Sequence, residues 1–273
     1  MDSHDIPTQP LNRPKRLTVP QLWVGFVDEF PAELREWTYR ELLDADERAR
    51  HDRYRHERDR NLHLTARLMT RTVLSRCMPG ISPREWKFRP GPHGKPEIAR
   101  PQMHSDEWHF NVTHTEGVVV LAVAQGSPVG VDVESSGRPM NFEGLARRFF
   151  APEEAAVIEA ADEGQRAALF YRIWTLKEAY VKAIGKGLAH PLDAFWFDPP
   201  DRFERAPRLM VKTDTGEANF ESSWQARVSH VGHGQAWIVS AVAAAGTEDA
   251  AMDPEEWPIR PFGFEVATWA IQG

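Results

Sequence analysis

The 273-residue chain has a single cysteine and lacks any long apolar run. Cys77 cannot form an internal disulfide, which favours a reducing compartment such as the cytoplasm. No segment approaches the ~18–20 apolar residues that span a membrane. Residues 1–20 contain four prolines and resemble neither a secretory signal nor a folded element. We therefore expect a cytoplasmic protein with no membrane segment and a flexible N-terminal arm over residues 1–20.

The chain also lacks the residue groupings that mark several common sites. No cysteines and histidines have zinc-ligand spacing, and no Ser-His-Asp arrangement is evident. The formal net charge of −7 argues against nucleic acid as a main partner. Against this acidic background, residues 48–60 contain six arginines. Such a segment indicates either a local site for a specific anion or a solvated helix face.

Periodicity and punctuation predict an α+β fold with irregular alternation of helices and strands. Helices are expected at 32–40, 46–56, 59–77 and 167–184, the last ending at Gly185. Two apolar strands, 118–124 and 129–134, flank a Gln-Gly-Ser-Pro turn, so we expect a hairpin whose second strand is central in its sheet. Further strands are expected at 22–26, 84–88, 108–112, 195–197, 208–212, 224–228, 236–243 and 262–271.

The order of these elements repeats along the chain. A long helix, then glycine and proline punctuation, then an aromatic strand occurs first near Trp86 and again near Trp196. We expect two pseudo-symmetric α+β halves, 21–125 and 126–245, followed by a linker and a C-terminal strand over 246–273. Clefts between such halves are common ligand sites, so the active site is expected there.

Asp132 and Glu134 are two residues apart on an expected strand and therefore share one face. An amphipathic strand with a solvated acidic face explains them without any function. On a central strand, however, the two carboxylates would repel each other and lose hydration, and a bound Mg²⁺ would relieve both costs.

Glu178 and Lys182 are four residues apart on the second long helix and also share a face. A surface ion pair of about 0.3–0.5 kcal/mol explains them without any function. The alternative is a phosphate site, since Lys177, Lys182 and Lys186 lie near a helix end that terminates in Gly185-Lys186-Gly187.

The order of the motifs is more specific than any one of them. The arginine-rich segment is followed by Gly94-Lys95-Pro96, a Phe-Asn-Val-Thr-His run at 110–114, Gly-Val-Asp-Val-Glu at 130–134, Arg-Arg-Phe-Phe at 147–150 and Trp-x-x-Lys-Glu-Ala-x-x-Lys at 174–182. In this order they resemble the 4′-phosphopantetheinyl transferases of the surfactin-synthetase-activating (Sfp-like) type. The resemblance runs from about Leu42 to Phe197.

The resemblance implies a monomer of two similar α+β halves that binds coenzyme A in the cleft between them. Such an enzyme moves the 4′-phosphopantetheine arm to a serine of an apo acyl or peptidyl carrier protein and releases adenosine 3′,5′-bisphosphate. It implies Mg²⁺ held by Asp132, Glu134 and Glu178 against the pyrophosphate. Lys182 would stabilise the leaving group, and either Glu178 or a water on the metal would accept the serine proton.

The resemblance also implies a set of contacts to coenzyme A, namely Arg50, Arg53, Arg60, Lys95, Thr113, His114 and Lys182. Thr113 lies where serine is frequent in the family, and Glu47 lies where some members have lysine. Two other functions are compatible with the chain. One is a catalytically idle subunit of a synthase complex that binds coenzyme A or a nucleotide. The other is a metal-dependent phosphohydrolase, although such enzymes usually gather more metal ligands than one three-acid cluster.

Overall fold

The computed structural model describes residues 17–99, 107–135, 140–187, 190–198, 201, 205–212, 217–232, 237–245, 254–263 and 265–267. Its helices are α1 (Ala32–Trp37), α2 (Ala45–Asp52), α3 (Glu57–Cys77), α4 (Phe142–Phe149), α5 (Pro152–Ala160) and α6 (Glu163–Ile184). A π-helical turn, Thr38–Leu42, follows α1 directly. None of the described helices is long and apolar enough to cross a membrane.

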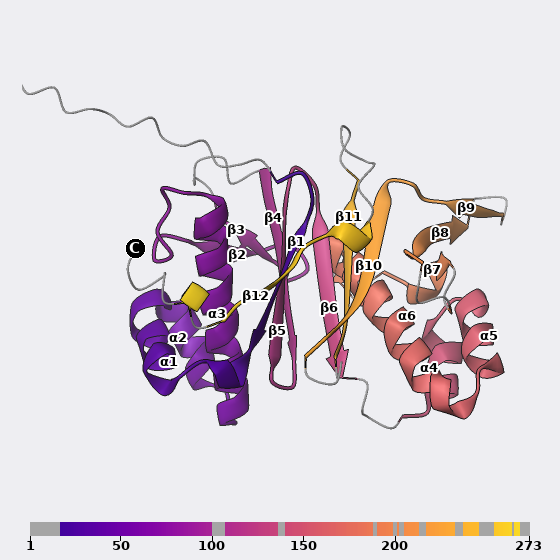
Figure 1. Ribbon diagram of the computed structural model, residues 1–273, viewed down its shortest axis with the longest axis horizontal. Coiled ribbons are helices and arrows are strands. Elements are labelled where there is room, and N and C mark those ends of the chain that lie inside the picture. Colours follow the sequence, from indigo (N-terminus) through magenta and orange to yellow (C-terminus); the bar gives the residue numbers. More distant parts are fainter. Residues whose placement is uncertain are drawn as a thin grey trace, which may run out of the picture.

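The described strands form two main sheets and two small ones (Figure 1). The first main sheet has the order β12-β1-β5-β4 and the second the order β10-β11-β6, while β2 pairs with β3 and β8 lies between β7 and β9. The strands are β1 (Gln21–Phe26), β2 (Phe88–Pro90), β3 (Pro96–Ile98), β4 (Trp108–Thr115), β5 (Val118–Gln125), β6 (Val129–Ser135), β7 (Phe195–Asp198), β8 (Arg208–Lys212), β9 (Ala218–Phe220), β10 (Trp224–Val231), β11 (Trp237–Ala244) and β12 (Ile259–Pro261).

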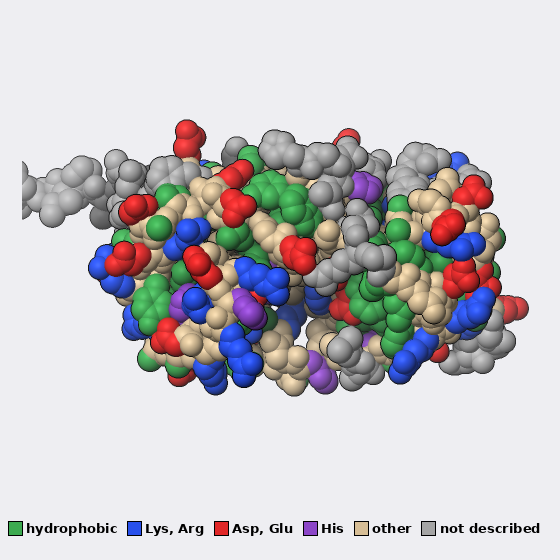
Figure 2. Space-filling view, turned by 90° about the horizontal axis from the view of Figure 1, so that it is seen from below, with side chains coloured by type: hydrophobic (Ala, Val, Ile, Leu, Met, Phe, Trp, Pro, Cys, Tyr) green, Lys and Arg blue, Asp and Glu red, His purple; other side chains and the backbone are tan. Residues whose placement is uncertain are grey.

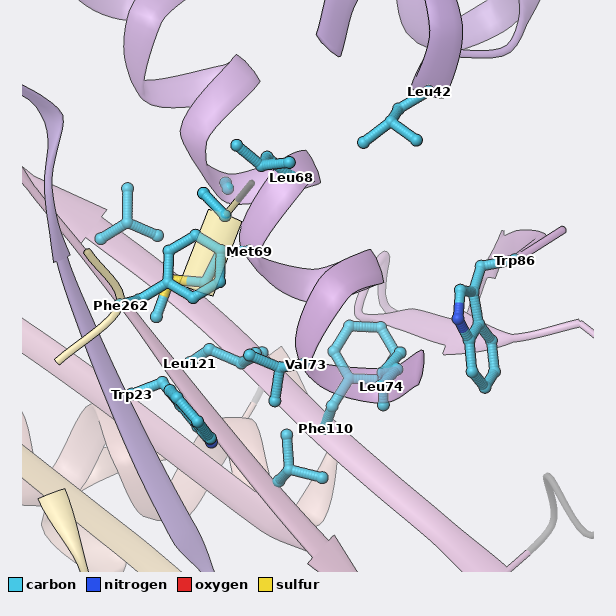
Figure 3. Close-up of a cluster of buried hydrophobic side chains, with 14 of the residues drawn as sticks. Trp23, Leu42, Leu68, Met69, Val73, Leu74, Trp86, Phe110, Leu121 and Phe262 are labelled. Atoms are coloured by element: carbon cyan, nitrogen blue, oxygen red, sulfur yellow. The ribbon is translucent and has the colours of Figure 1, made fainter. Parts of the chain in front are cut away.

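The two main sheets stack between α3 on one side and α6 on the other (Figure 1). On β5, Val119, Leu121 and Val123 face the core beneath α3, whereas Val118 and Val120 face the second sheet. Both faces of β5 are therefore covered, which explains its unbroken apolar sequence. Figure 3 shows the first of these cores, in which Met69 and Val73 of α3 meet Leu121 and Phe110.

The expected pseudo-symmetry is confirmed by the order of the strands. In the first half β5 lies between β1 and β4, and in the second half β11 lies between β6 and β10, with every pairing antiparallel. Each half therefore repeats the arrangement of one strand, a long helix and a later hairpin. The long helices α3 and α6 take equivalent places in the two halves.

The expected hairpin between residues 118–124 and 129–134 is wrong. Both edges of β5 are already paired, with β1 and with β4, so β6 passes to the second sheet and pairs with β11. Within that sheet β6 is an edge strand rather than a central one. Its free edge lies beside β4, where Asn111 Oδ1 accepts a hydrogen bond of 2.9 Å from the Val131 amide.

Other boundaries also differ from the expectations. The second helix ends at Asp52 rather than residue 56, and the strand expected at 84–88 begins only at Phe88. The C-terminal strand is β12, at residues 259–261, whereas 265–267 form a helical turn. Most of the expected N-terminal arm, residues 1–16, lies outside the described residues.

Candidate active site

The polar face of β6 points toward α6, and Gly130 brings the two elements into close contact. A Cβ atom at Gly130 would collide with the Ala179 carbonyl oxygen and the Ala183 amide nitrogen of α6. Only glycine lets the helix backbone lie this close to the strand. The approach sets Asp132, two residues further along β6, against the last turns of α6.

Asp132 and Lys182 form the central contact of the site. Lys182 Nζ lies 2.5 Å from Asp132 Oδ1 and donates a second hydrogen bond of 3.2 Å to Thr113 Oγ1 on β4. The Thr113 hydroxyl in turn donates to Asp132 Oδ1 at 3.3 Å. Strand β4 of the first half therefore meets β6 and α6 of the second at one point.

Two carboxylate oxygens at this point are buried without a hydrogen-bond partner among the described residues: Asp132 Oδ2 and Glu178 Oε1. Burial raises the pKa of Asp132, although Lys182 and the Thr113 hydroxyl act in the opposite direction. Burial also raises the pKa of Glu178, and the Asp132 charge adds to this rise while Lys182 opposes it. Orphaned buried oxygens of this kind are costly unless a cation meets them.

The acids therefore fit a divalent cation in part. Asp132 and Glu178 each have one buried oxygen without a partner among the described residues, and Glu134 lies half-buried on the same face of β6. Within the described residues, no three acidic, histidine or cysteine side chains lie close enough together to form a metal-binding group. Lys182 supplies the positive charge next to Asp132 in this arrangement.

Basic side chains of the first half approach the same point. Burial first, and then the charges of Lys182 and Arg50, lower the pKa of His114 at the end of β4. Burial, followed by the charges of Arg67, His51 and Arg50 at the end of α2, lowers the pKa of His63 to about 3. Figure 2, in which the molecule is seen from below, shows lysine, arginine and histidine side chains around a hollow in the middle of the surface. Cations placed this closely repel one another, so the arrangement favours an anionic ligand.

The other two predicted arginines, Arg53 and Arg60, are placed differently. Arg60 Nη1 donates to the Tyr54 carbonyl at 2.8 Å and to the Arg55 carbonyl at 3.4 Å, so it holds the turn between α2 and α3. Arg53 is the exposed C-cap residue of α2. Of the three predicted arginines, Arg50 is the one whose charge acts on His114.

Glu47, which departs from the family pattern, has a structural role. Its side chain accepts from Arg71 at 2.6 Å, lies 3.4 Å from Arg67, and completes a capping box with Asp44 at the start of α2. Glu47 therefore connects α2 to α3, and its carboxylate is occupied by these contacts within the protein.

Lys95 and Lys177 do not point at this group of acids. Lys95 Nζ donates to the carbonyl oxygens of Val129 and Lys182, at 3.0 and 2.8 Å. Lys177 is fully buried on another side of α6, where its ammonium lies 2.7 Å from Glu154. The expectation that Lys177 helps to form a phosphate site is therefore wrong, because its charge is neutralised inside the protein.

Sequence reasoning did not identify two residues that shape the site. Gly130 was part of a recognised motif, yet its contact with α6 was not foreseen; a glycine inside an apolar strand is the signal of such a close approach. His63 is buried on α3 and accepts from Arg67 Nε at 3.4 Å. Its place beside Arg50 and His114 arises from the packing of α2 on α3, which spacing does not reveal.

Comparison with known proteins gives consistent matches. Residues 128–242 match the family described as the 4′-phosphopantetheinyl transferase superfamily, and residues 31–126 match the one described as 4′-phosphopantetheinyl transferase, N-terminal. A solved structure, the Thermotoga maritima holo-[acyl-carrier-protein] synthase, is 25% identical over 43% of this chain and 62% of its own, with a TM-score of 0.33.

Three relatives show how far the likeness extends. The Synechocystis sp. protein slr0495 is 34% identical over 205 residues, which cover 74% of this chain and 78% of that protein. The Nostoc sp. 4′-phosphopantetheinyl transferase HetI is 31% identical and covers 66% of this chain and 76% of its own. The Bacillus subtilis 4′-phosphopantetheinyl transferase Sfp is 31% identical and covers 56% and 65%. The chain belongs to the 4′-phosphopantetheinyl transferase family.

Proposed function

We propose that this protein transfers the 4′-phosphopantetheine arm of coenzyme A to a serine of an apo acyl or peptidyl carrier protein, with release of adenosine 3′,5′-bisphosphate. One observation carries the proposal: Lys182, Asp132 and Thr113 meet at one point, beside the orphaned Glu178 oxygen and the basic side chains Arg50 and His114. Buried carboxylates that a cation would stabilise therefore lie next to basic side chains that an anion would stabilise. A pyrophosphate with a bound metal satisfies both.

Asp132, Glu134 and Glu178 are the residues that would hold Mg²⁺. The orphaned oxygens Asp132 Oδ2 and Glu178 Oε1 support the first and third of these assignments. When bound, the ion would neutralise charge that grows on the pyrophosphate as its P–O bond breaks.

Either Glu178 or a water on the metal would accept the proton of the carrier serine. Burial raises the pKa of Glu178, which favours Glu178 as the base, whereas coordination to a metal would act in the opposite direction. The serine oxygen then forms a bond to the β-phosphorus of coenzyme A, and the bond from that phosphorus to the bridging oxygen breaks. Lys182 Nζ, which shares hydrogen bonds with Asp132 and Thr113, stabilises the negative charge of the departing bisphosphate.

Arg50, Thr113 and His114 are the proposed contacts to the other phosphate oxygens. A guanidinium fork suits a terminal phosphate, and Arg53 on the same exposed end of α2 extends the basic surface. Arg60 acts on this surface through the α2–α3 turn that it holds. Lys95 is not included, because two of its N–H groups donate to main-chain carbonyls.

We further propose a cytoplasmic monomer whose two halves divide near residue 125, with the 246–273 segment as linker and C-terminal strand. The free Cys77 supports a reducing compartment. The family matches on either side of residue 127 support the division into two halves. Because the protein has a net charge of −7, it would dock an acidic carrier protein through local basic or apolar surface.

Intact-protein mass spectrometry of apo carrier proteins, incubated with coenzyme A, Mg²⁺ and this protein, tests the proposal. We expect each accepted carrier to gain one phosphopantetheine, adenosine 3′,5′-bisphosphate to appear in equal amount, and both products to be lost when EDTA is added. Tight binding of coenzyme A without modification of any carrier would refute the transfer and favour an idle binding subunit. Release of phosphate with no modified carrier would favour a hydrolase.

A further inference from the structure

Lys95 links the two halves of the molecule directly beneath the site. It follows Gly94 in the turn between β2 and β3, in the first half, and its half-buried side chain reaches into the second half. There Nζ donates to the carbonyl oxygen of Val129 at 3.0 Å and to that of Lys182 at 2.8 Å.

Each of the two acceptors belongs to an element that carries the chemistry. Val129 is the first residue of β6, which presents Asp132. Lys182 lies in the last turn of α6, which ends at Gly185 with a left-handed φ of 69°. Carbonyls in the last turn of a helix have no partner within the helix, and a cation there also meets the negative end of the helix dipole. The Lys95 ammonium therefore caps α6 and ties it to the start of β6.

We propose that Lys95 is a positioning residue, which clamps the end of α6 to β6 and thereby holds the Lys182 side chain against Asp132. The kinetic part of this inference rests on the proposed transfer reaction. It assigns to Lys95 a different task from the phosphate contact that the family resemblance implies. A phosphate ligand acts on coenzyme A directly, whereas Lys95 acts through Lys182.

The position of Lys182 shows why a clamp is needed. Gly130 brings β6 and α6 together at Ala179 and Ala183, but the last turn of a helix frays first. Lys182 lies in that turn, and its main-chain carbonyl is the atom that Lys95 holds. Burial lowers the pKa of Lys95 to about 8, as expected for an ammonium group enclosed between two halves. A neutral amine still donates hydrogen bonds, so the clamp persists when Lys95 loses its proton.

Replacement of Lys95 with methionine removes both hydrogen bonds and keeps a side chain of similar length. In steady-state transfer assays we expect Lys95→Met to lower kcat by at least about tenfold, since small misplacements of a reacting group have large effects. The KM for coenzyme A should stay within about threefold of the wild-type value. Lys95→Arg, which keeps donors at this position, should recover part of kcat. Lys87→Met, at an exposed lysine of the same region, is the matched control and should behave as wild type.

Hydrogen–deuterium exchange supplies a readout that needs neither carrier protein nor turnover. Amides at the end of α6 and the start of β6 should exchange faster in Lys95→Met, and not in Lys87→Met. The proposal is overturned if exchange is unchanged, or if the KM and Kd for coenzyme A rise about tenfold at constant kcat, which would identify Lys95 as a phosphate ligand. Failure of the wild-type protein to modify any carrier would refute the proposed function, and the exchange experiment would still test the clamp.

Discussion

At the scale of single residues, burial of the Asp132 carboxylate reduces the stability of the folded protein. Asp132 is only 5% exposed, and one of its oxygens has no partner among the described residues. Because burial raises its pKa, the folded protein binds a proton at Asp132 more tightly than the unfolded chain does. This carboxylate therefore lowers stability as the pH rises above its unfolded pKa of about 4. Such a cost is typical of residues retained for function.

Asp132→Asn is expected to abolish phosphopantetheine transfer, with a loss of at least about 100-fold, and to leave the free energy of unfolding at pH 7 unchanged or higher. The amide keeps the shape of the side chain and loses the buried negative charge that has to be desolvated. Transfer assays and urea unfolding measured in parallel check both parts.

Asp198→Asn is the control for that variant. The Asp198 side chain on β7 is 40% exposed and pairs with Arg208 at 2.8 Å, and surface pairs of this kind contribute about 0–1 kcal/mol. Its activity should be that of the wild type. Near-normal transfer by Asp132→Asn would contradict the site, and a clear loss of stability would contradict the argument from burial.

At the scale of elements, α6 serves two purposes on different faces. Glu178 and Lys182 are one turn apart and face β6, whereas Lys177 lies about 140° around the helix from Lys182 by the 3.6-residue period. Lys177 donates to the Leu192 and Phe195 carbonyls, each at 2.6 Å, and pairs with Glu154 of α5. The motif therefore combines Lys177, which is buried in the fold, with Lys182, for which we propose a role in the chemistry, and helical geometry places them on different faces.

Gly130→Ala is expected to lower both transfer activity and stability, because the new Cβ must push α6 away from β6. A collision with main-chain atoms cannot be relieved by a side-chain rotation, so we expect a loss of about 1–3 kcal/mol. Urea unfolding and carrier modification assays measure the two effects.

Gly164→Ala, in the first turn of α6, provides the matched control. A Cβ there has nothing within 4 Å, so the alanine should be neutral or stabilise the protein by up to about 1 kcal/mol. Equal behaviour of the two alanine variants would show that the close approach at Gly130 does not position α6.

At the scale of the whole molecule, the C-terminal segment joins the two halves. Arg227 of β10 donates to the Trp257 carbonyl, and Trp257 is buried among residues of both main sheets. Strand β12 then pairs in parallel with β1, and Phe262 enters the core beneath α3 (Figure 3). The segment therefore touches second-half and first-half elements in succession.

Trp257→Ala is expected to destabilise the protein by about 3–5 kcal/mol, since it empties a buried site between the two sheets. The shift of the urea midpoint measures this loss. Phe220→Ala, at an aromatic residue that is 45% exposed, should stay within about 0.5 kcal/mol of the wild type. A loss below about 1 kcal/mol for Trp257→Ala would mean that the two sheets pack independently of the C-terminal segment.

The sequence by itself determined the local elements and the kind of chemistry. The long helices and the apolar strands follow from periodicity, because these signals lie within a few residues of one another. The order of the elements indicated the two α+β halves, and the order of the motifs between about Leu42 and Phe197 indicated the family. It also placed Glu178 and Lys182 on one helix face and Asp132 and Glu134 on one strand face.

Only the tertiary structure decided which of these faces meet. The partner of β6 proved to be β11 because both edges of β5 were occupied, and Arg50 rather than Arg60 approached His114 because α2 packs on α3. Lys95 ended on the carbonyl of Lys182, 87 residues away. Such choices depend on competition among distant surfaces for the same hydrogen-bonding edges and the same buried space, and no spacing along one chain encodes that competition locally.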